Sequence, residues 1–244
     1  MPVPMKIAYV ALFDILGFSE LVRRNELSIV ADAYSGAKEA LADILSHVNA
    51  LNEGFKVDVA VGYRSFSDTF LIHTSDTSED AFLSLLAACD GLFIGAIENK
   101  LLLRGAVTRG EIITQAGMEI GRPIVDAYKT EQRQDWSGCW ITDQCFSDID
   151  VNTYFAHKSL VQYEIPLKDG EVKTCVAFNW VKSLTWKVMF ENKKNDFGLE
   201  QIEAQVSFMN QRRTDWAIRR KLDNTKKFME FVLSPDFIEA YKKG

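Results

Sequence analysis

An unbroken apolar run from Ile7 to Phe13 ends at an aspartate, and this junction constrains the fold more than any other part of the chain. A continuous apolar run of this length is typical of a central strand that is covered on both faces. The turn at Leu16–Ser19 leads into a helical stretch that reaches about His47, which we expect to hold two helices. The sequence therefore predicts a buried strand that ends at Asp14 and turns directly into a helix.

A second aspartate occupies a similar position further along the chain. Strand-like residues from 57 to 73 surround Asp68, which predicts a hairpin with Asp68 at its tip. An ionised carboxylate at the end of a buried strand is costly unless a cation pairs with it. Asp14 and Asp68 together therefore indicate a divalent-metal site. Each also has an ordinary alternative, since Asp14 is a possible helix N-cap and Asp68 a common turn residue.

The remaining pattern predicts a mixed fold. We expect a helix over 79–99, a strand over 101–108 that turns at Arg109-Gly110 and returns over 111–114, a helix over 123–132 and a strand over 139–142. This order, β-α-α-β-β-α-β-β-α-β, predicts an α+β, ferredoxin-like fold with a mostly antiparallel sheet covered by helices. We expect residues 1–178 to form the main domain and residues 179–244 a charged helical extension packed on the same unit.

Composition narrows the class of function. The chain has 244 residues and a net charge of -6, which argues against a general nucleic-acid or membrane-surface binder and favours a small-molecule ligand. Four cysteines without CxxC spacing and three histidines indicate neither a zinc site nor a disulfide framework. The N-terminal apolar run meets a charge at Asp14, too soon for a signal peptide or membrane span. We therefore expect a cytoplasmic protein without nucleic-acid or membrane partners.

Three motifs in order resemble those of class III nucleotide cyclases. The segment Phe13-Asp14-Ile15-Leu16-Gly17-Phe18-Ser19 resembles the first metal motif of that family, and Ser67-Asp68 on a hairpin is similar to the second. The segment Arg104-Gly-Ala-Val-Thr-Arg-Gly-Glu111 resembles the strand and turn that follow. The resemblance covers roughly residues 5 to 145 and implies the catalytic fold of these cyclases.

The resemblance also implies a two-metal site. Asp14 and Asp68 would bridge two Mn²⁺ or Mg²⁺ ions, and the carbonyl of Ile15 would add one more ligand. The chain turns into a helix directly after Asp14, so we expect the backbone amides of Leu16, Gly17, Phe18 and Ser19 to cradle the β- and γ-phosphates of a nucleoside triphosphate. Class III sites form between two chains, which implies a head-to-tail homodimer.

Two positions in the predicted helix over 123–132 depart from the family. The transition-state asparagine would fall on Val125, while Lys129 takes the place of the transition-state arginine and would act across the dimer interface. Lysine still supplies charge to a phosphate, although without a bidentate fork. The segment Gly121–Glu131 instead resembles the cyclases of Pycsar antiviral systems, which make cyclic UMP or cyclic CMP.

Arg64 is the candidate for reading the base. It lies four residues before Asp68, where adenylyl cyclases usually place a purine-reading lysine, and its rigid donor fork suits a carbonyl-bearing pyrimidine such as uracil. An ion pair with Asp58 or Glu111 is the alternative. We therefore expect a uridylate cyclase whose product acts on a separate effector. A cytidylate or purine cyclase and a catalytically silent nucleotide-binding module remain as alternatives.

Overall fold

The computed structural model describes residues 5–115, 117–182 and 216–234. The strands are β1 (Met5–Ile15), β2 (Val61–Phe66), β3 (Thr69–Thr74), β4 (Leu103–Gln115), β5 (Met118–Gly121), β6 (Gly138–Ile141), β7 (Leu160–Pro166) and β8 (Val172–Phe178). The helices are α1 (Phe18–Arg24), α2 (Leu27–Gly54), α3 (Glu79–Glu98), α4 (Arg122–Arg133), α5 (Val151–Ala156) and α8 (Trp216–Val232), with a 3₁₀ turn at Asp143–Phe146. The predicted element order is confirmed from β1 to β6.

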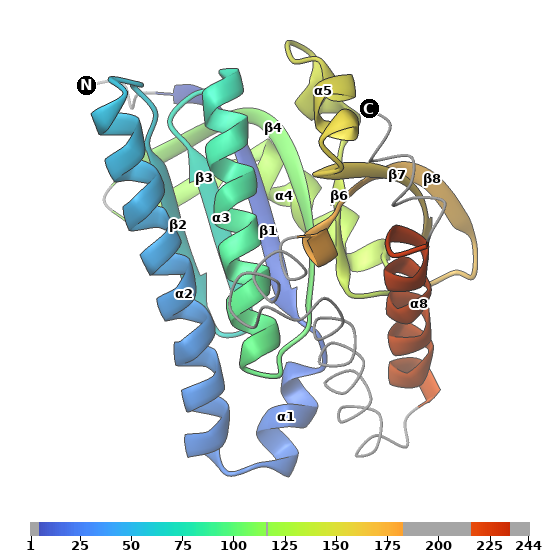
Figure 1. Cartoon of the computed structure of the whole chain (residues 1–244). Helices are drawn as coiled ribbons and strands as arrows, with labels where there is room; N and C mark the ends of the chain where they lie inside the picture. Colours follow the sequence, from blue (N-terminus) through green and yellow to red (C-terminus); the bar gives the residue numbers. More distant parts are fainter. Residues whose placement is uncertain (1–4, 116, 183–215, 235–244) are drawn as a thin grey trace, which may run out of the picture.

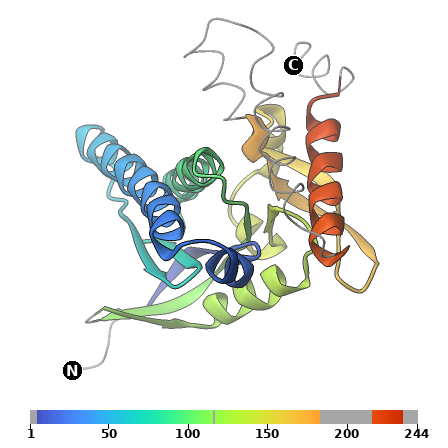
Figure 2. The same ribbon diagram turned by 90° about the horizontal axis from the view of Figure 1, so that it is seen from below.

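All eight strands belong to one sheet in the order β2-β3-β1-β4-β6-β8-β7, with β5 paired to the outer part of β4. The pairs are antiparallel except for β4 with β6, which are parallel. Strand β1 is central and pairs with β3 on one side and β4 on the other. Figure 1 shows α2 and α3 side by side over the sheet, and Figure 2 shows α4 on the opposite side.

Alternate residues of β1 point to the two faces of the sheet, as the two-residue period of a strand requires. Tyr9 and Phe13 are fully buried in the large core beneath α2 and α3. Leu12 lies on the other face, in a small cluster with Ala106 of β4 and Ala127 of α4. Both faces of β1 are thus covered, which explains why its apolar run is continuous rather than alternating.

The predicted turn at Arg109-Gly110 is wrong. Strand β4 runs on through Gly110, which pairs with Ala8, because β1 offers a partner as far as Ile113. The chain reverses at Gly117, whose φ of 79° lies in the left-handed region that glycine accepts readily. The returning strand is therefore β5 rather than residues 111–114, and β7 and β8 extend the sheet beyond the part that the sequence patterns addressed.

Helix α8 contacts the loop between α4 and β6. The backbone amide of Ser137 donates to Thr225 Oγ1 at 2.8 Å, and the ring of Trp136 meets that of Phe228 at 4.8 Å between centroids. Residues 183–215 and 235–244 lie outside the described residues, so the proposed boundary between residues 178 and 179 stays a prediction.

Helix α3 is the one described helix that is long and apolar enough to cross a membrane. Buried residues make up 72% of its most apolar window, as in the core helix of a globular domain. All four cysteines are free, and burial raises the pKa of the Cys89, Cys139 and Cys145 thiols.

Candidate active site

The fold brings Asp14 and Asp68 together. Asp14 lies in β1 opposite Thr69, and the backbone amide of Ile15 donates to the carbonyl of Asp68 at 3.0 Å. Asp68 lies close enough to Asp14 for the two carboxyl groups to interact. Burial, the charge of Glu131 and the adjacent Asp68 raise the pKa of Asp14 to about 7, against the opposing effect of Arg104.

Local sequence explains this placement. Ser67 and Asp68 alone connect β2 to β3, and Ser67 has a φ of 54°, so the tight hairpin holds Asp68 next to the end of β1. On the core face, the ring of Phe13 lies over Gly105 of β4, where an added Cβ would come within 2.2 Å of Phe13 Cδ1. The large ring on one strand and the glycine opposite it together fix the position of Asp14.

A buried ion pair lies beside Asp14, and the sequence patterns did not predict it. Arg104 of β4 lies opposite Asp14 and donates from Nε to Glu131 Oε1 of α4, with its Nη2 also in contact with that oxygen. Its Nη1 donates to the carbonyl of Gln134 at 3.1 Å. Arg104 Nη2 and Asp14 Oδ2 are 3.7 Å apart, which is an ion-pair contact but longer than a hydrogen bond.

The donor set fits a divalent cation that shares its coordination with a phosphate. Within the described ranges, no three side chains of His, Cys, Asp or Glu are grouped to hold a metal ion by themselves. Mg²⁺ is usually held by one or two carboxylates together with substrate phosphates, and Mn²⁺ also prefers oxygen ligands. Adjacent carboxylates, one with a raised pKa, form such a set, because a cation would remove their repulsion.

The loop after Asp14 differs from the expectation at one residue. The amide of Leu16 donates to the carbonyl of Leu102 at 2.8 Å, so it is not free for a phosphate, because the chain is still paired with the segment before β4. The amides of Gly17, Phe18 and Ser19 donate to no other described residue. Gly17 has a φ of 72° and precedes α1, as the predicted turn into a helix requires. Phosphate binding at these three amides stays a prediction.

Arg64 is engaged by a residue other than either expected partner. Its Nε donates to Glu119 Oε1 at 3.0 Å, so the acidic partner is Glu119 of β5 rather than Asp58 or Glu111. The Arg64 side chain is 54% exposed, whereas that of Glu119 is largely buried. Arg64 pairs with Leu71 of β3, which belongs to the clusters on the α4 face, the face that also carries Asp14.

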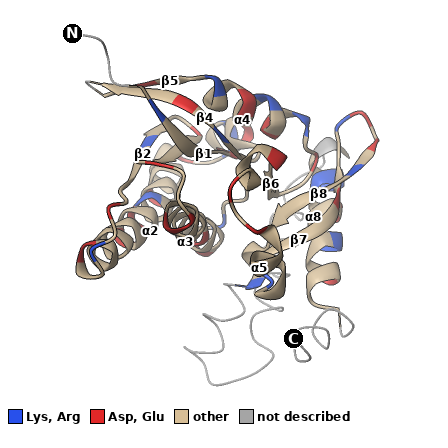
Figure 3. Cartoon of the chain, turned by 90° about the horizontal axis from the view of Figure 1, so that it is seen from above, with Lys and Arg blue, Asp and Glu red and all other residues tan. Residues whose placement is uncertain are grey.

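Lys129 and Val125 lie on the exposed side of α4, one helical turn apart. Helix α4 instead turns Ala127 and Glu131 toward the sheet. Within one chain, Lys129 therefore lies on the side of α4 that points away from the sheet, whereas Asp14 lies on the sheet face that α4 covers. Figure 3 shows basic and acidic residues along α4, so this helix does not carry charge of one sign only.

Comparison with solved structures identifies the fold. No family model and no curated protein sequence matches the chain. A bacterial light-regulated adenylyl cyclase superimposes with a TM-score of 0.50 and 9% identity, over 84% of this chain and 58% of that one. The guanylyl cyclase Cya2 superimposes with a TM-score of 0.47 and 13% identity, over 73% of this chain and 93% of that one. The adenylyl cyclase CyaB from P. aeruginosa superimposes with a TM-score of 0.44 and 15% identity, over 73% of this chain and 96% of that one.

The α+β sheet with its covering helices is the catalytic fold of class III nucleotide cyclases, and the expected fold is thereby confirmed. At this level of identity the similarity establishes the fold alone. The chemistry has to be argued from the residues of this chain.

Proposed function

We propose that this chain is a nucleotide cyclase that converts UTP to 3′,5′-cyclic UMP and pyrophosphate. The observation that carries the proposal is the position of Asp68 beside Asp14 at the end of β1, held by the backbone hydrogen bond from Ile15 to Asp68, within a cyclase fold. A helix N-cap at Asp14 or a turn residue at Asp68 would not require a second aspartate nearby. Two adjacent carboxylates repel each other without a cation.

The residues would act mainly by positioning. Asp14 and Asp68, with the carbonyl of Ile15, would hold two Mn²⁺ or Mg²⁺ ions, which when bound would activate the attacking hydroxyl and neutralise the triphosphate. The ribose O3′ attacks the α-phosphorus of the same nucleotide, loses its proton, and pyrophosphate leaves. Since nucleophile and electrophile belong to one molecule, orientation rather than a strong protein base is the main requirement.

The proposed enzyme is a head-to-tail homodimer with sites at the interface. The exposed position of Lys129 supports this arrangement, because its ammonium is available to the phosphates of a nucleotide bound at a second chain's Asp14 and Asp68. The exposed apolar side chains of Met118, Ile120 and Val125 lie on β5 and α4, beside the same surface. Ile112, by contrast, is buried core.

UTP is proposed as the substrate because Arg64 offers fixed donors on the Asp14 face of the sheet. A cytidylate or purine cyclase is the nearer alternative. The exposed Val125, where the family has a catalytic asparagine, favours a second candidate of another class, a catalytically silent module that binds nucleotide. As a cyclase, the protein would act in the cytoplasm, and its product would bind a separate effector in antiviral defence.

The deciding experiment is incubation of the purified protein with ATP, GTP, CTP and UTP, each with Mn²⁺, followed by mass spectrometry of the products. We expect cyclic UMP from UTP. Cyclic CMP or a purine product would retain the cyclase and reject the role of Arg64. Stabilisation by nucleotide and Mn²⁺ without turnover would favour the silent module.

Variants at the carboxylates test the site directly. We expect Asp14→Ala and Asp68→Ala each to reduce turnover at least about 10³-fold, because each removes metal ligation worth several kcal/mol in the transition state. Asp32→Ala is the matched control, since Asp32 is an exposed aspartate on α2, and it should retain full activity. Turnover near the wild-type rate in either site variant would reject the metal assignment.

A further inference from the structure

Arg104 stands between two carboxylates that compete for it. Its guanidinium contacts Glu131 through Nε and Nη2, and Nη1 donates to the carbonyl of Gln134. Its Nη2 lies 3.7 Å from Asp14 Oδ2. Arg104 and Glu131 are almost completely buried, so water does little to screen these charges. The position of this one cation therefore governs how much negative charge Asp14 presents to a ligand.

We infer that Glu131 is a positioning residue that holds Arg104 away from Asp14 and so keeps the Asp14 carboxylate available to a divalent cation. This inference rests on the proposed metal site and adds a residue to it. Helix α4 begins at Arg122 and brings Glu131 down to the sheet two turns later, opposite the end of β1. The contact with Glu131 keeps Arg104 from making a full ion pair with Asp14.

The alternative is that Arg104 and Glu131 only fasten α4 to β4. Breaking a buried ion pair weakens a fold whether or not the pair affects a ligand. The two roles differ when both charges are removed. A fastening role predicts that the double variant is at least as impaired as the single one, whereas removal of the competing arginine should restore metal binding.

The experiment is a titration of the full chain with Mn²⁺ alone, followed by the electron paramagnetic resonance signal of free Mn²⁺, which does not depend on turnover. We expect Glu131→Gln to weaken Mn²⁺ binding about 10- to 100-fold, the range found when a group that supports a metal ligand is removed. The double variant Arg104→Gln/Glu131→Gln should bind Mn²⁺ as tightly as the wild type. Glu131→Asp, which retains the charge, should stay within a few-fold of the wild type.

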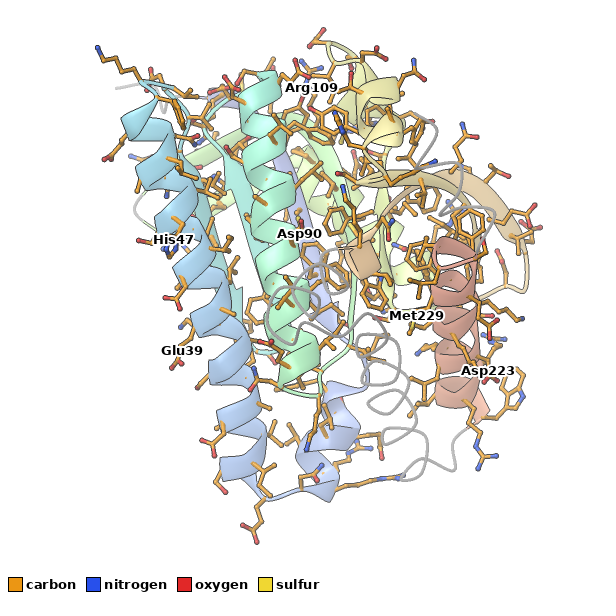
Figure 4. The ribbon with its side chains drawn as sticks, viewed as in Figure 1. Glu39, His47, Asp90, Arg109, Asp223 and Met229 are labelled. Carbon is orange, nitrogen blue, oxygen red and sulfur yellow. The ribbon has the colours of Figure 1, made fainter. Side chains whose placement is uncertain are left out.

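The control removes the acidic partner of another arginine on the same strand. Arg109 contacts Asp148 and lies at the opposite end of the sheet from α1, as Figures 1 and 4 show. Asp148→Asn should leave Mn²⁺ binding unchanged. Circular dichroism melting identifies any variant that does not fold. If Glu131→Gln does not fold, Glu131→Asp replaces it in the test. Loss of Mn²⁺ binding in a folded Glu131→Asp variant would contradict the inference.

Each outcome has a distinct meaning. Weak binding in Glu131→Gln with recovery in the double variant supports the inference. Equal binding in Glu131→Gln and the wild type overturns it, and so does equally weak binding in the single and double variants. Absence of Mn²⁺ binding to the wild-type protein, both alone and with a non-cyclisable UTP analogue that supplies phosphate ligands, rejects the metal site itself, and the proposed function with it.

Discussion

The two faces of the sheet differ in how they are covered. The face beneath α2 and α3 is packed with large apolar side chains, including the fully buried rings of Phe13, Phe70 and Phe93. The opposite face has small clusters under α4, and next to them the buried charges of Arg104 and Glu131. Large apolar burial stabilises a fold, whereas a buried ion pair adds little or no net stability, because both charges lose their water. Neighbouring residues of β1 thus lie in two different environments.

The largest expected effect on stability is at Phe13, and it should exceed the effect at the neighbouring Leu12. We predict that Phe13→Ala lowers the free energy of unfolding by about 3–5 kcal/mol, because it opens a cavity in the large core. Leu12→Ala, on the α4 face, should cost about 2 kcal/mol, since the small cluster there collapses more readily. Denaturant titration measures both. Equal losses would mean that the α4 face contributes as much stability as the other.

The pH dependence of stability should reveal the charged face. The folded pKa of Asp14 is about 7, above the ordinary 3.8, so the protonated form is favoured in the folded protein. This stabilisation is fully present below about pH 4 and is lost as the pH rises through 7, and a shift of this size corresponds to roughly 4 kcal/mol at most.

Melting temperatures of the metal-free protein at pH 5 and pH 8 measure the effect. We expect the wild type to fall more than Asp14→Asn between these two values, because the variant has no charge to bury at this position. Mn²⁺ at pH 8 should raise the melting temperature of the wild type and not that of the variant. The same fall in both proteins would show that Asp14 is not the group responsible.

A subunit-mixing experiment tests whether the α4 face is shared between chains. We predict that Lys129→Ala lowers the turnover rate about 10- to 100-fold, as expected for loss of one charge-assisted contact to a phosphate. Mixing it with the inactive Asp14→Asn protein should restore activity, because one of the two sites in the mixed dimer then has both residues. No recovery, in a mixture shown to form mixed dimers, would place Lys129 outside the shared site.

The smallest effect on stability is expected at Arg64. Arg64 is half exposed but Glu119 is largely buried, so Arg64→Ala should lower the free energy of unfolding by about 1 kcal/mol, the cost of leaving the Glu119 carboxylate without this partner. If the arginine reads the base, the same variant should lose preference among the four nucleotides. Glu119→Gln is the matched control, since it breaks the pair and keeps the arginine. Unchanged selectivity in Arg64→Ala would remove this residue from base recognition.

Residue patterns along the chain predicted the elements better than the contacts between them. The apolar run of β1, the helical spacing in α3 and the hairpin at Asp68 are local signals, and the structure confirms them. The pairing of Arg104 with Glu131 joins residues on different elements that meet only when α4 crosses the sheet, and no local pattern records this.

The wrongly predicted turn at Gly110 also led to a wrong acidic partner for Arg64. A turn at Gly110 makes Glu111 the nearest acidic residue on the returning strand, whereas the actual turn at Gly117 gives that place to Glu119, the residue that binds Arg64. Glycine accepts both extended and left-handed backbone, so the sequence does not distinguish the two positions. The pairing of β4 with the whole length of β1 decides between them.

The contact between α8 and the rest of the fold has a consequence for the order of synthesis. Aromatic rings meet in succession from Phe13 through Phe93 and Trp180 to Phe228 of α8. Phe228 also covers Trp136, which follows the helix that carries Glu131 and Lys129. Because a chain is made from its N-terminus, these tryptophans lack their ring contacts with Phe228 until α8 has left the ribosome. A nascent chain that already contains Asp14, Asp68 and Lys129 therefore still lacks the packing of α8 on the loop that follows α4.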